Sequence, residues 1–255
     1  MLDMVLERAR HASPLHMTKL SLKEKILLAV VLGVDKRETV PYGELSFPFA
    51  PQISLDVLGS WVFCERSVFY STTSRMVKEN LIAINNGVVK LTDNGKNILA
   101  RNFPYLFLKK EKWDGFWRII VFDIKEAERY KRDKLRNYLI KIKYVPISDG
   151  VWVTHHSVHH FIFDGMGESI IYIEGKLQQN EIDKILLKHD MFSINVEYGR
   201  LCTALKRARD LHKNDTIPLL RSQFLEIFAN DPQMPLELLP KDWVGEKAKR
   251  IFLKS

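Results

Sequence analysis

The 255-residue sequence has few cysteines and no long apolar run, and these absences argue against a disulfide-rich protein and against a membrane-spanning one. Its 2 cysteines, Cys64 and Cys202, are too few for a cysteine-rich zinc site, and we expect buried thiols rather than a disulfide. The longest apolar stretch, 26–34, is far shorter than the roughly 20 residues that a membrane-spanning helix requires. The N-terminus lacks the basic head and apolar run of a signal peptide. These features predict a cytoplasmic protein that has no membrane partner.

Positive charge is concentrated in one part of the chain. The sequence holds 39 basic and 31 acidic residues, a formal net charge of +8, with 46% hydrophobic residues as in globular proteins. Residues 1–108 carry 13 basic and 10 acidic side chains, residues 109–150 carry 12 and 7, and residues 151–255 carry 14 of each. The excess therefore lies in the first 150 residues, as expected when an N-terminal half faces nucleic acid.

Start and stop signals predict two helices near the N-terminus. Ser21 and Glu24 form a capping box before an apolar run, which places a helix at 22–32. Prolines and glycines interrupt residues 35–53, and a short helix at 55–63 follows.

The next segment predicts a polar helix followed by a hairpin. Residues 66–80 contain no glycine or proline and have apolar side chains at helical spacing. Strands at 81–84 and 88–91 flank an Asn-Asn-Gly turn at 85–87, and a short helix at 92–101 comes next. Helix, helix, polar basic helix and hairpin is the order of a winged helix-turn-helix.

The polar face of the helix at 66–80 supplies the candidate DNA contacts. Such a helix fits the major groove and reads base edges, while a hairpin reaches the backbone or the minor groove. We expect Arg66 and Lys78 to contact phosphates, which carry no sequence information. The expected base-reading residues are Tyr70, Ser71, Ser74 and Arg75, and the hairpin contributes Asn85, Asn86 and Lys90. The alternative is a solvated helix face beside an ordinary hairpin.

The middle of the chain predicts a small sheet with a basic helix. The expected order is strand 117–123, helix 127–143, strands 144–147 and 151–155, strand 169–174 and helix 181–189. This order matches a ferredoxin-like βαββ(α)β fold with a short or irregular second helix. Four cations of the first helix form a candidate accessory phosphate surface, with a solvated face as the alternative: Lys131, Arg132, Lys134 and Arg136. The remaining chain predicts helices at 196–211 and 216–230, a proline-rich tail and a last short helix.

Two patterns are candidate metal sites. Asp123 ends the first central strand, and two copies of this carboxylate in a dimer are suited to hold a Mg²⁺ that assists phosphodiester cleavage. A histidine run offers pairs at i, i+4 for Zn²⁺ or Ni²⁺ if it is helical, with Asp164 nearby: His155, His156, His159 and His160. The alternatives are a structural carboxylate at Asp123 and a polar or pH-sensitive contact of the histidines at a domain junction.

Three separated motifs share their order and spacing with a known family. The first is WDGFWR at 113–118 with FDI at 122–124, and the second is DGVWV at 149–153, which follows Arg132 and Arg136. The third is the tail at 231–245, which contains the segments DP, ELLP and DW. In these motifs the chain resembles the PaaX family of bacterial repressors that control phenylacetate degradation. Together with the winged-helix pattern, the resemblance covers nearly the whole chain.

The resemblance implies an α+β repressor in three parts. These are a winged helix-turn-helix domain at 1–108 with an arm at 1–18, a ferredoxin-like domain at 109–190 similar to the small CRISPR adaptation nuclease, and a helical domain at 191–255. Members are expected to bind a palindromic operator as homodimers and to release it when an acyl-coenzyme A effector binds. The stretch 155–167 departs from the acidic helical segment that the family has there.

The predicted function is therefore sequence-specific binding of double-stranded DNA by a dimeric transcriptional repressor that requires no cofactor and no catalytic residue. Two other classes stay open. One is a metal-dependent nuclease of the CRISPR-adaptation type that uses Asp123 and Mg²⁺. The other is an assembly adaptor without an effector.

Overall fold

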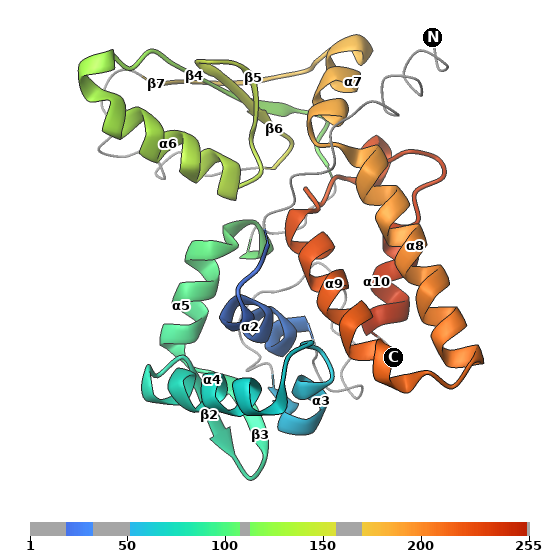
Figure 1. Cartoon of the computed structure of the whole chain (residues 1–255). Coiled ribbons are helices and arrows are strands. Elements are labelled where there is room, and N and C mark those ends of the chain that lie inside the picture. Colours follow the sequence, from blue (N-terminus) through green and yellow to red (C-terminus); the bar gives the residue numbers. More distant parts are fainter. Residues whose placement is uncertain (1–18, 33–51, 108–112, 157–169, 254–255) are drawn as a thin grey trace.

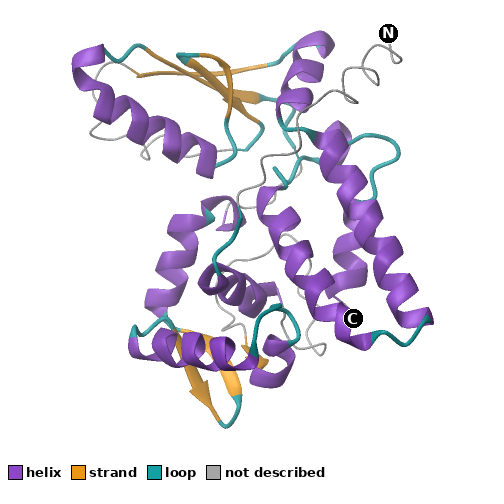
Figure 2. Cartoon of the chain, viewed as in Figure 1, coloured by secondary structure: helices purple, strands orange, loops and turns teal. Residues whose placement is uncertain are grey.

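The computed structural model describes residues 19–32, 52–107, 113–156 and 170–253. These residues form an α+β structure with two antiparallel sheets, which confirms the predicted class (Figure 2). No helix in these ranges is long and apolar enough to cross a membrane. The expected arm at 1–18 lies outside the described residues, as do His159, His160 and Asp164.

Within residues 19–32 and 52–107, the N-terminal part contains five helices or turns and a three-stranded sheet. Its elements are α2 (Leu22–Leu32), β1 (Gln52–Ser54), α3 (Leu55–Gly59), α4 (Arg66–Lys78), β2 (Ile82–Asn85), β3 (Val88–Leu91), α5 (Asp93–Asn102) and the 3₁₀ turn η1 (Pro104–Phe107). The predicted capping box is confirmed: the Ser21 amide donates to Glu24 at 2.9 Å, and the Glu24 amide donates to the Ser21 hydroxyl at 3.3 Å. The sheet order is β1-β3-β2.

Two expectations for this part were incomplete. The helix predicted at 55–63 ends at Gly59, because Trp61 and Val62 turn into the core instead of continuing the helix. The strand β1 was not predicted, because it adjoins a segment that prolines and glycines interrupt and depends on antiparallel pairing with the distant strand β3. Short strands of this kind are defined by long-range pairing and leave little periodic signal.

Helix α2 lies at the centre of the N-terminal part and has no fully exposed side (Figure 1). The residues from Ile26 to Val30 are completely buried, as in a helix surrounded by other elements. The close approach of α5 to the start of the hairpin requires Gly95, because a Cβ there would lie 2.0 Å from the Leu81 carbonyl oxygen. Helix α2 packs against α4, and α5 packs against the hairpin strand β3.

In residues 113–156 and 170–188, the central part is a four-stranded sheet with one helix on each side. Its elements are β4 (Trp117–Phe122), the 3₁₀ turn η2 (Glu126–Glu128), α6 (Arg129–Lys141), β5 (Val145–Ser148), β6 (Val151–Thr154), β7 (Ile170–Gly175) and α7 (Gln179–Lys188). The order β5-β6-β4-β7, antiparallel throughout, is that of a ferredoxin-like sheet. One face packs on α6 through Leu135 and Leu139, and the other packs on α7 through Ile185.

The C-terminal part consists of three helices and a tail. Its elements are α8 (Met191–Asp210), the 3₁₀ turn η4 (Asn214–Thr216), α9 (Ile217–Asn230), the 3₁₀ turn η5 (Leu236–Leu238) and α10 (Gly245–Leu253). Helix α8 begins five residues before the predicted start at 196. Asp190, with a left-handed backbone φ of 49°, is its N-cap and accepts a hydrogen bond from the Ser193 amide.

The N-terminal and C-terminal helices share one hydrophobic core. A single cluster of buried residues includes α2 and α4 together with α8, α9 and α10. Lys25 of α2 pairs with Glu226 of α9 at 2.7 Å, and Arg221 of α9 lies 5.3 Å from the ring centre of Trp61. The Tyr105 hydroxyl donates to the Ala229 carbonyl at 3.0 Å. Helix α4 therefore packs on a core to which both the N-terminal and the C-terminal helices contribute.

Candidate nucleic-acid interface

Helix α4 separates a buried face from a polar one. Phe69, Thr72, Thr73 and Met76 are buried against the core. Every α4 residue predicted to contact DNA is exposed: Arg66, Tyr70, Ser71, Ser74, Arg75 and Lys78. The sequence periodicity therefore placed the two faces of this helix correctly.

The cations of α4 have no acidic partner in the part of the chain that the structure describes. No ion pair joins Arg66, Arg75 or Lys78 to a carboxylate, and Glu79 at the end of the helix pairs instead with Lys23 at 2.6 Å. The Arg66 guanidinium lies 5.6 Å from the ring centre of Tyr70. Unpaired cations on an exposed helix can release counterions from a nucleic acid when they meet its phosphates.

Sequence reasoning missed one polar residue of this surface. Ser67 is exposed and belongs to a stripe with Ser71, Ser74 and Lys78 at the spacing i, i+4, i+7, i+11. This stripe lies directly opposite the buried residues, at 100° of rotation per residue. The same periodicity that identified the buried face would have identified Ser67.

The predicted hairpin turn is present next to α4 (Figure 1). Asn86 and Gly87 both have positive φ, 50° and 74°, as a tight two-residue turn between twisted strands requires. Asn85 and Asn86 are exposed at the tip. Lys90 is only half-exposed and lies on β3, the central strand, away from the turn. The tip thus presents amides, and its nearest predicted cation is set back from it.

The accessory cations on α6 differ from those of α4, because most of them pair with acidic neighbours. Arg132 pairs with Glu126 at 2.7 Å, Lys131 pairs with Glu128, and Arg136 donates to the Asp149 carbonyl at 3.0 Å. These contacts lower the pKa of the Glu126 and Glu128 carboxyls, chiefly through the hydrogen bonds from Arg132 and Lys131. Lys134 is exposed and has no ion pair among the described residues.

The two candidate metal patterns lie apart from this surface. Asp123 is exposed directly after β4, and no group of three or more histidine, cysteine or acidic residues in the described ranges is arranged to hold a metal ion. His155 is buried with Nε2 3.2 Å from the Gln233 carbonyl oxygen, and His156 Nε2 lies 3.2 Å from that of Pro232. Both rings follow a strand, so the geometry of these two matches a junction contact better than a helical chelate.

The tail that the two histidines contact is joined to the central and C-terminal parts of the molecule. Asp231 is fully buried, accepts from the Tyr198 hydroxyl at 2.9 Å and pairs with Lys249 at 3.3 Å. The Lys143 ammonium donates to the Ala229 carbonyl at 2.7 Å, and burial lowers the pKa of Lys143 to about 8. The tail motif therefore has a structural role at the junction of the central and C-terminal parts.

The WDGFWR motif likewise has a structural role. Arg118 is buried on β4 and donates to the Asp114 carboxylate at 2.9 Å and to Glu174 of β7 at 3.2 Å. Its hydrogen bond lowers the pKa of Asp114. Gly115 between them has a φ of 80°, which a residue with a side chain rarely adopts. These contacts join β4 to β7 and to the segment that precedes β4.

Comparisons with known proteins agree in the central and C-terminal parts. One family model, described as the PaaX protein central Cas2-like domain, matches residues 110–169, and another, the PaaX-like protein C-terminal domain, matches residues 189–255. A solved structure of the uncharacterized protein Rv0674 from Mycobacterium tuberculosis is similar with a TM-score of 0.56 and 15% identity, over 99% of this chain and 93% of that chain. No curated protein matches the sequence.

Proposed function

The chain belongs to the PaaX family, and on this basis we propose that it is a transcriptional repressor that binds DNA sequence-specifically through α4. The observation that carries the proposal is the exposed, polar face of α4 with its unpaired cations. The proposal requires no catalytic residue.

The order of elements supports a winged helix-turn-helix at residues 1–108. Helix α2, strand β1, helices α3 and α4 and the hairpin β2–β3 follow one another, and β1 pairs with β3 to complete the small sheet. In this arrangement α4 is the recognition helix and the turn at Asn86 is the tip of the wing. Ser71, Ser74 and Arg75 read base edges, while Arg66 and Lys78 contact phosphates.

The repressor acts as a homodimer on a palindromic operator, with the two α4 helices about 34–36 Å apart, one helical turn of DNA. The ferredoxin-like part at 109–190 and the helical part at 191–255 provide assembly and control. An acyl-coenzyme A thioester as the releasing effector rests on the family resemblance alone. Release then follows from differential affinity of the effector for two arrangements of the dimer.

Selection of bound fragments from a random duplex library tests the proposal. We expect recovery of one intact palindromic site. We expect Arg75→Ala to weaken the enrichment and to relax the sequence preference where Arg75 reads a base, while Asp123→Ala leaves the enrichment unchanged. The selected pool is also run on a denaturing gel with Mg²⁺. Enrichment of no sequence contradicts the proposal, and Mg²⁺-dependent cuts that disappear in Asp123→Ala replace it with the nuclease class.

A further inference from the structure

The three parts of the chain meet at one carbonyl oxygen, that of Ala229 in the last turn of α9. The Tyr105 hydroxyl of the N-terminal part donates to this oxygen at 3.0 Å, and the Lys143 ammonium of the central part donates to it at 2.7 Å. The same ammonium lies 4.4 Å from the centre of the Tyr105 ring, which is a cation–π contact. Carbonyl groups in the last turn of a helix have no partner within the helix and carry its negative end, so they attract a cation.

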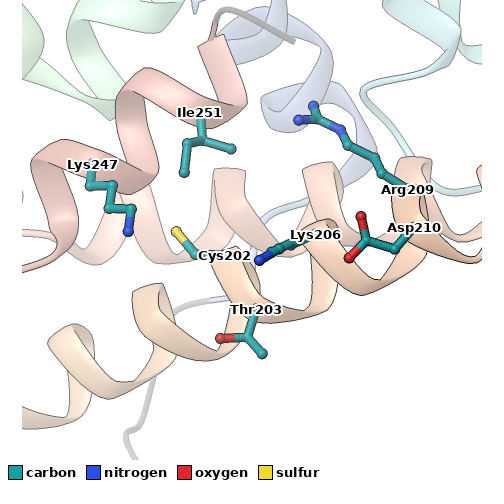
Figure 3. A pocket seen from close by; sticks show the side chains of 7 residues that line it. All are labelled: Cys202, Thr203, Lys206, Arg209, Asp210, Lys247 and Ile251. Carbon is teal, nitrogen blue, oxygen red and sulfur yellow. The ribbon is translucent and has the colours of Figure 1, made fainter.

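Lys143 differs from the cations at the surface of the C-terminal helices. Lys206, Arg209 and Lys247 line an open groove between α8 and α10 and are exposed, so water hydrates their charges (Figure 3). Lys143 is half-buried, and its ammonium faces Tyr105 and the end of α9. A cation in such a position has lost hydration that the surface cations keep.

The charge of Lys143 is compensated only in part. Among the residues that the structure describes, no ion pair joins Lys143 to a carboxylate. Burial lowers the pKa of Lys143 to about 8, and the negative charge of Asp231 opposes this shift incompletely. That carboxylate already pairs with Lys249 at 3.3 Å and accepts from the Tyr198 hydroxyl at 2.9 Å. Because the pKa lies below the ordinary value of 10.5, the fold disfavours the charged form of this lysine.

The backbone of Lys143 also has a conformation that favours another residue. Lys143 follows the end of α6 with a φ of 65°. Its amide donates to the Ile140 carbonyl at 3.1 Å, and the Tyr144 amide donates to the Leu139 carbonyl at 2.9 Å. These two bonds form the Schellman motif that ends many helices, and glycine is the preferred residue at its left-handed position. The chain therefore has a long cationic side chain where neither its charge nor its backbone is favourable.

The Lys143 contact connects two regions that have separate cores. The N-terminal and C-terminal helices share the large core and form the body that carries α4. Lys143 follows α6, whose apolar side chains belong to the small core of the ferredoxin-like sheet. The tail already attaches the two regions at residues 232–234, through His155, His156 and the cluster around Trp117. Lys143 adds a further attachment on α9 itself, and a second point of attachment fixes an angle that one point leaves free.

We propose that Lys143 is a positioning residue, whose contact with Tyr105 and Ala229 fixes the angle between the ferredoxin-like part and the body that carries α4. Unfavourable local conformations are retained where the geometry that they produce matters for function. In a dimer assembled through the ferredoxin-like part, this angle sets the distance between the two α4 helices and hence the half-site spacing that the dimer accepts. The angle itself does not depend on DNA binding, and only the half-site spacing rests on the proposed function.

The distance between two labels, one in each region, tests the proposal. The native cysteines are removed in Cys64→Ser and Cys202→Ser, and nitroxide labels are attached at Asn97→Cys on α5 and Lys134→Cys on α6, two exposed positions. Labelled chains are diluted with unlabelled ones, so that pulsed electron paramagnetic resonance measures the distance within one protomer. With Lys143 present we expect one narrow distance distribution.

Substitutions at position 143 separate positioning from folding. Lys143→Gly removes the ammonium and relieves the left-handed backbone, so its urea midpoint should be unchanged or higher while the distance distribution becomes about twice as broad. Lys143→Met should broaden the distribution likewise. Lys143→Arg keeps a cation and should keep the distribution narrow, as should the matched control Lys141→Met at the exposed end of α6. A narrow distribution in Lys143→Gly overturns the inference, and so does broadening that occurs only together with a lower urea midpoint.

Failure of this inference is distinguishable from failure of the proposed function. In selection from a random duplex library, Lys143→Gly should recover the same bases within each half-site as the unmodified chain but accept several half-site spacings. A protein that selects no duplex but shows the broader distribution in Lys143→Gly keeps the positioning role and loses the proposed function. A protein that selects its duplex and keeps a narrow distribution in Lys143→Gly gives the opposite result.

Discussion

Helices α4 and α6 have the same length, 13 residues, and each presents several basic side chains to solvent. They differ in what surrounds those side chains. The cations of α4 have no acidic partner in the described part of the chain, whereas Arg132 and Lys131 of α6 pair with Glu126 and Glu128. Helix α6 has more basic residues than α4, but among the described residues α4 has more basic residues without an acidic partner.

The difference matters because affinity for nucleic acid depends on cations that can neutralise phosphates and release counterions. An arginine that is paired with a carboxylate must break this ion pair before it binds a phosphate. The freed carboxylate then repels the phosphates. The two helices also rest on separate cores, since Met76 belongs to the large cluster shared with the C-terminal helices and Leu139 to the small cluster beneath α6.

The largest predicted effect is a loss of folding stability, and its spread through the molecule should differ between these two cores. Met76→Ala and Leu139→Ala each remove a fully buried side chain, and each should lower the free energy of unfolding by about 2–5 kcal/mol. Because Met76 shares a core with α9 and α10, its loss should also weaken amide protection there. Hydrogen exchange followed by mass spectrometry measures this spread. Equal loss of protection in α9 for both variants would contradict the separation.

The next largest effect concerns DNA affinity. Arg75→Ala should cost about 1–3 kcal/mol of binding to the selected site and relax the preference at one base pair. The matched variant Arg132→Ala on α6 should change this affinity far less, because its guanidinium is held by Glu126. Fluorescence anisotropy at fixed salt compares the two. A greater loss in Arg132→Ala would reverse the roles of the helices.

Salt dependence sharpens the comparison further. Lys78→Ala should reduce the slope of log K against log salt by about one, as expected for one lost phosphate contact. Lys131→Ala should leave the slope unchanged, because Lys131 is paired with Glu128. Titrations at four or more salt concentrations measure both slopes, and a reduced slope in Lys131→Ala alone would be inconsistent with free cations on α4.

The smallest effect is the titration of the α6 carboxylates. The hydrogen bond from Arg132 lowers the pKa of Glu126 below its ordinary value of 4.5. A carboxyl pKa that is lower in the folded state stabilises the fold above that ordinary value, and this contribution disappears as the pH falls through the folded pKa. In Arg132→Gln the NMR-followed midpoint of Glu126 should rise toward 4.5. An unchanged midpoint would show that the pair does not form in solution.

Local signals in the sequence were sufficient for much of the fold. The capping box at Ser21, the periodicity of α4 and the Asn86-Gly87 turn depend on neighbours within a few residues, and all three appear as expected. The strand β1 and the start of α8 were missed. The first depends on pairing with a distant strand, and the second on a left-handed cap at Asp190 that has no strong sequence signal.

The sequence was sufficient to predict which residues form the candidate site, but not which carboxylates and carbonyl groups the predicted residues contact. Spacing identified the exposed face of α4, but it could not show which cations are neutralised. Arg136 meets Asp149 across 13 residues, and the histidines at 155 and 156 meet carbonyls more than 70 residues away. Such contacts depend on tertiary packing, as does the shared core of the two chain ends.

Lysine footprinting of the unmodified chain tests most directly the claim that α4 rather than α6 faces DNA. The protein is acetylated with and without its selected duplex, and the modified lysines are quantified by mass spectrometry. We predict that the duplex protects Lys78 on α4 and leaves Lys131 and Lys134 on α6 reactive. Protection of Lys131 and Lys134 with a reactive Lys78 would contradict the account.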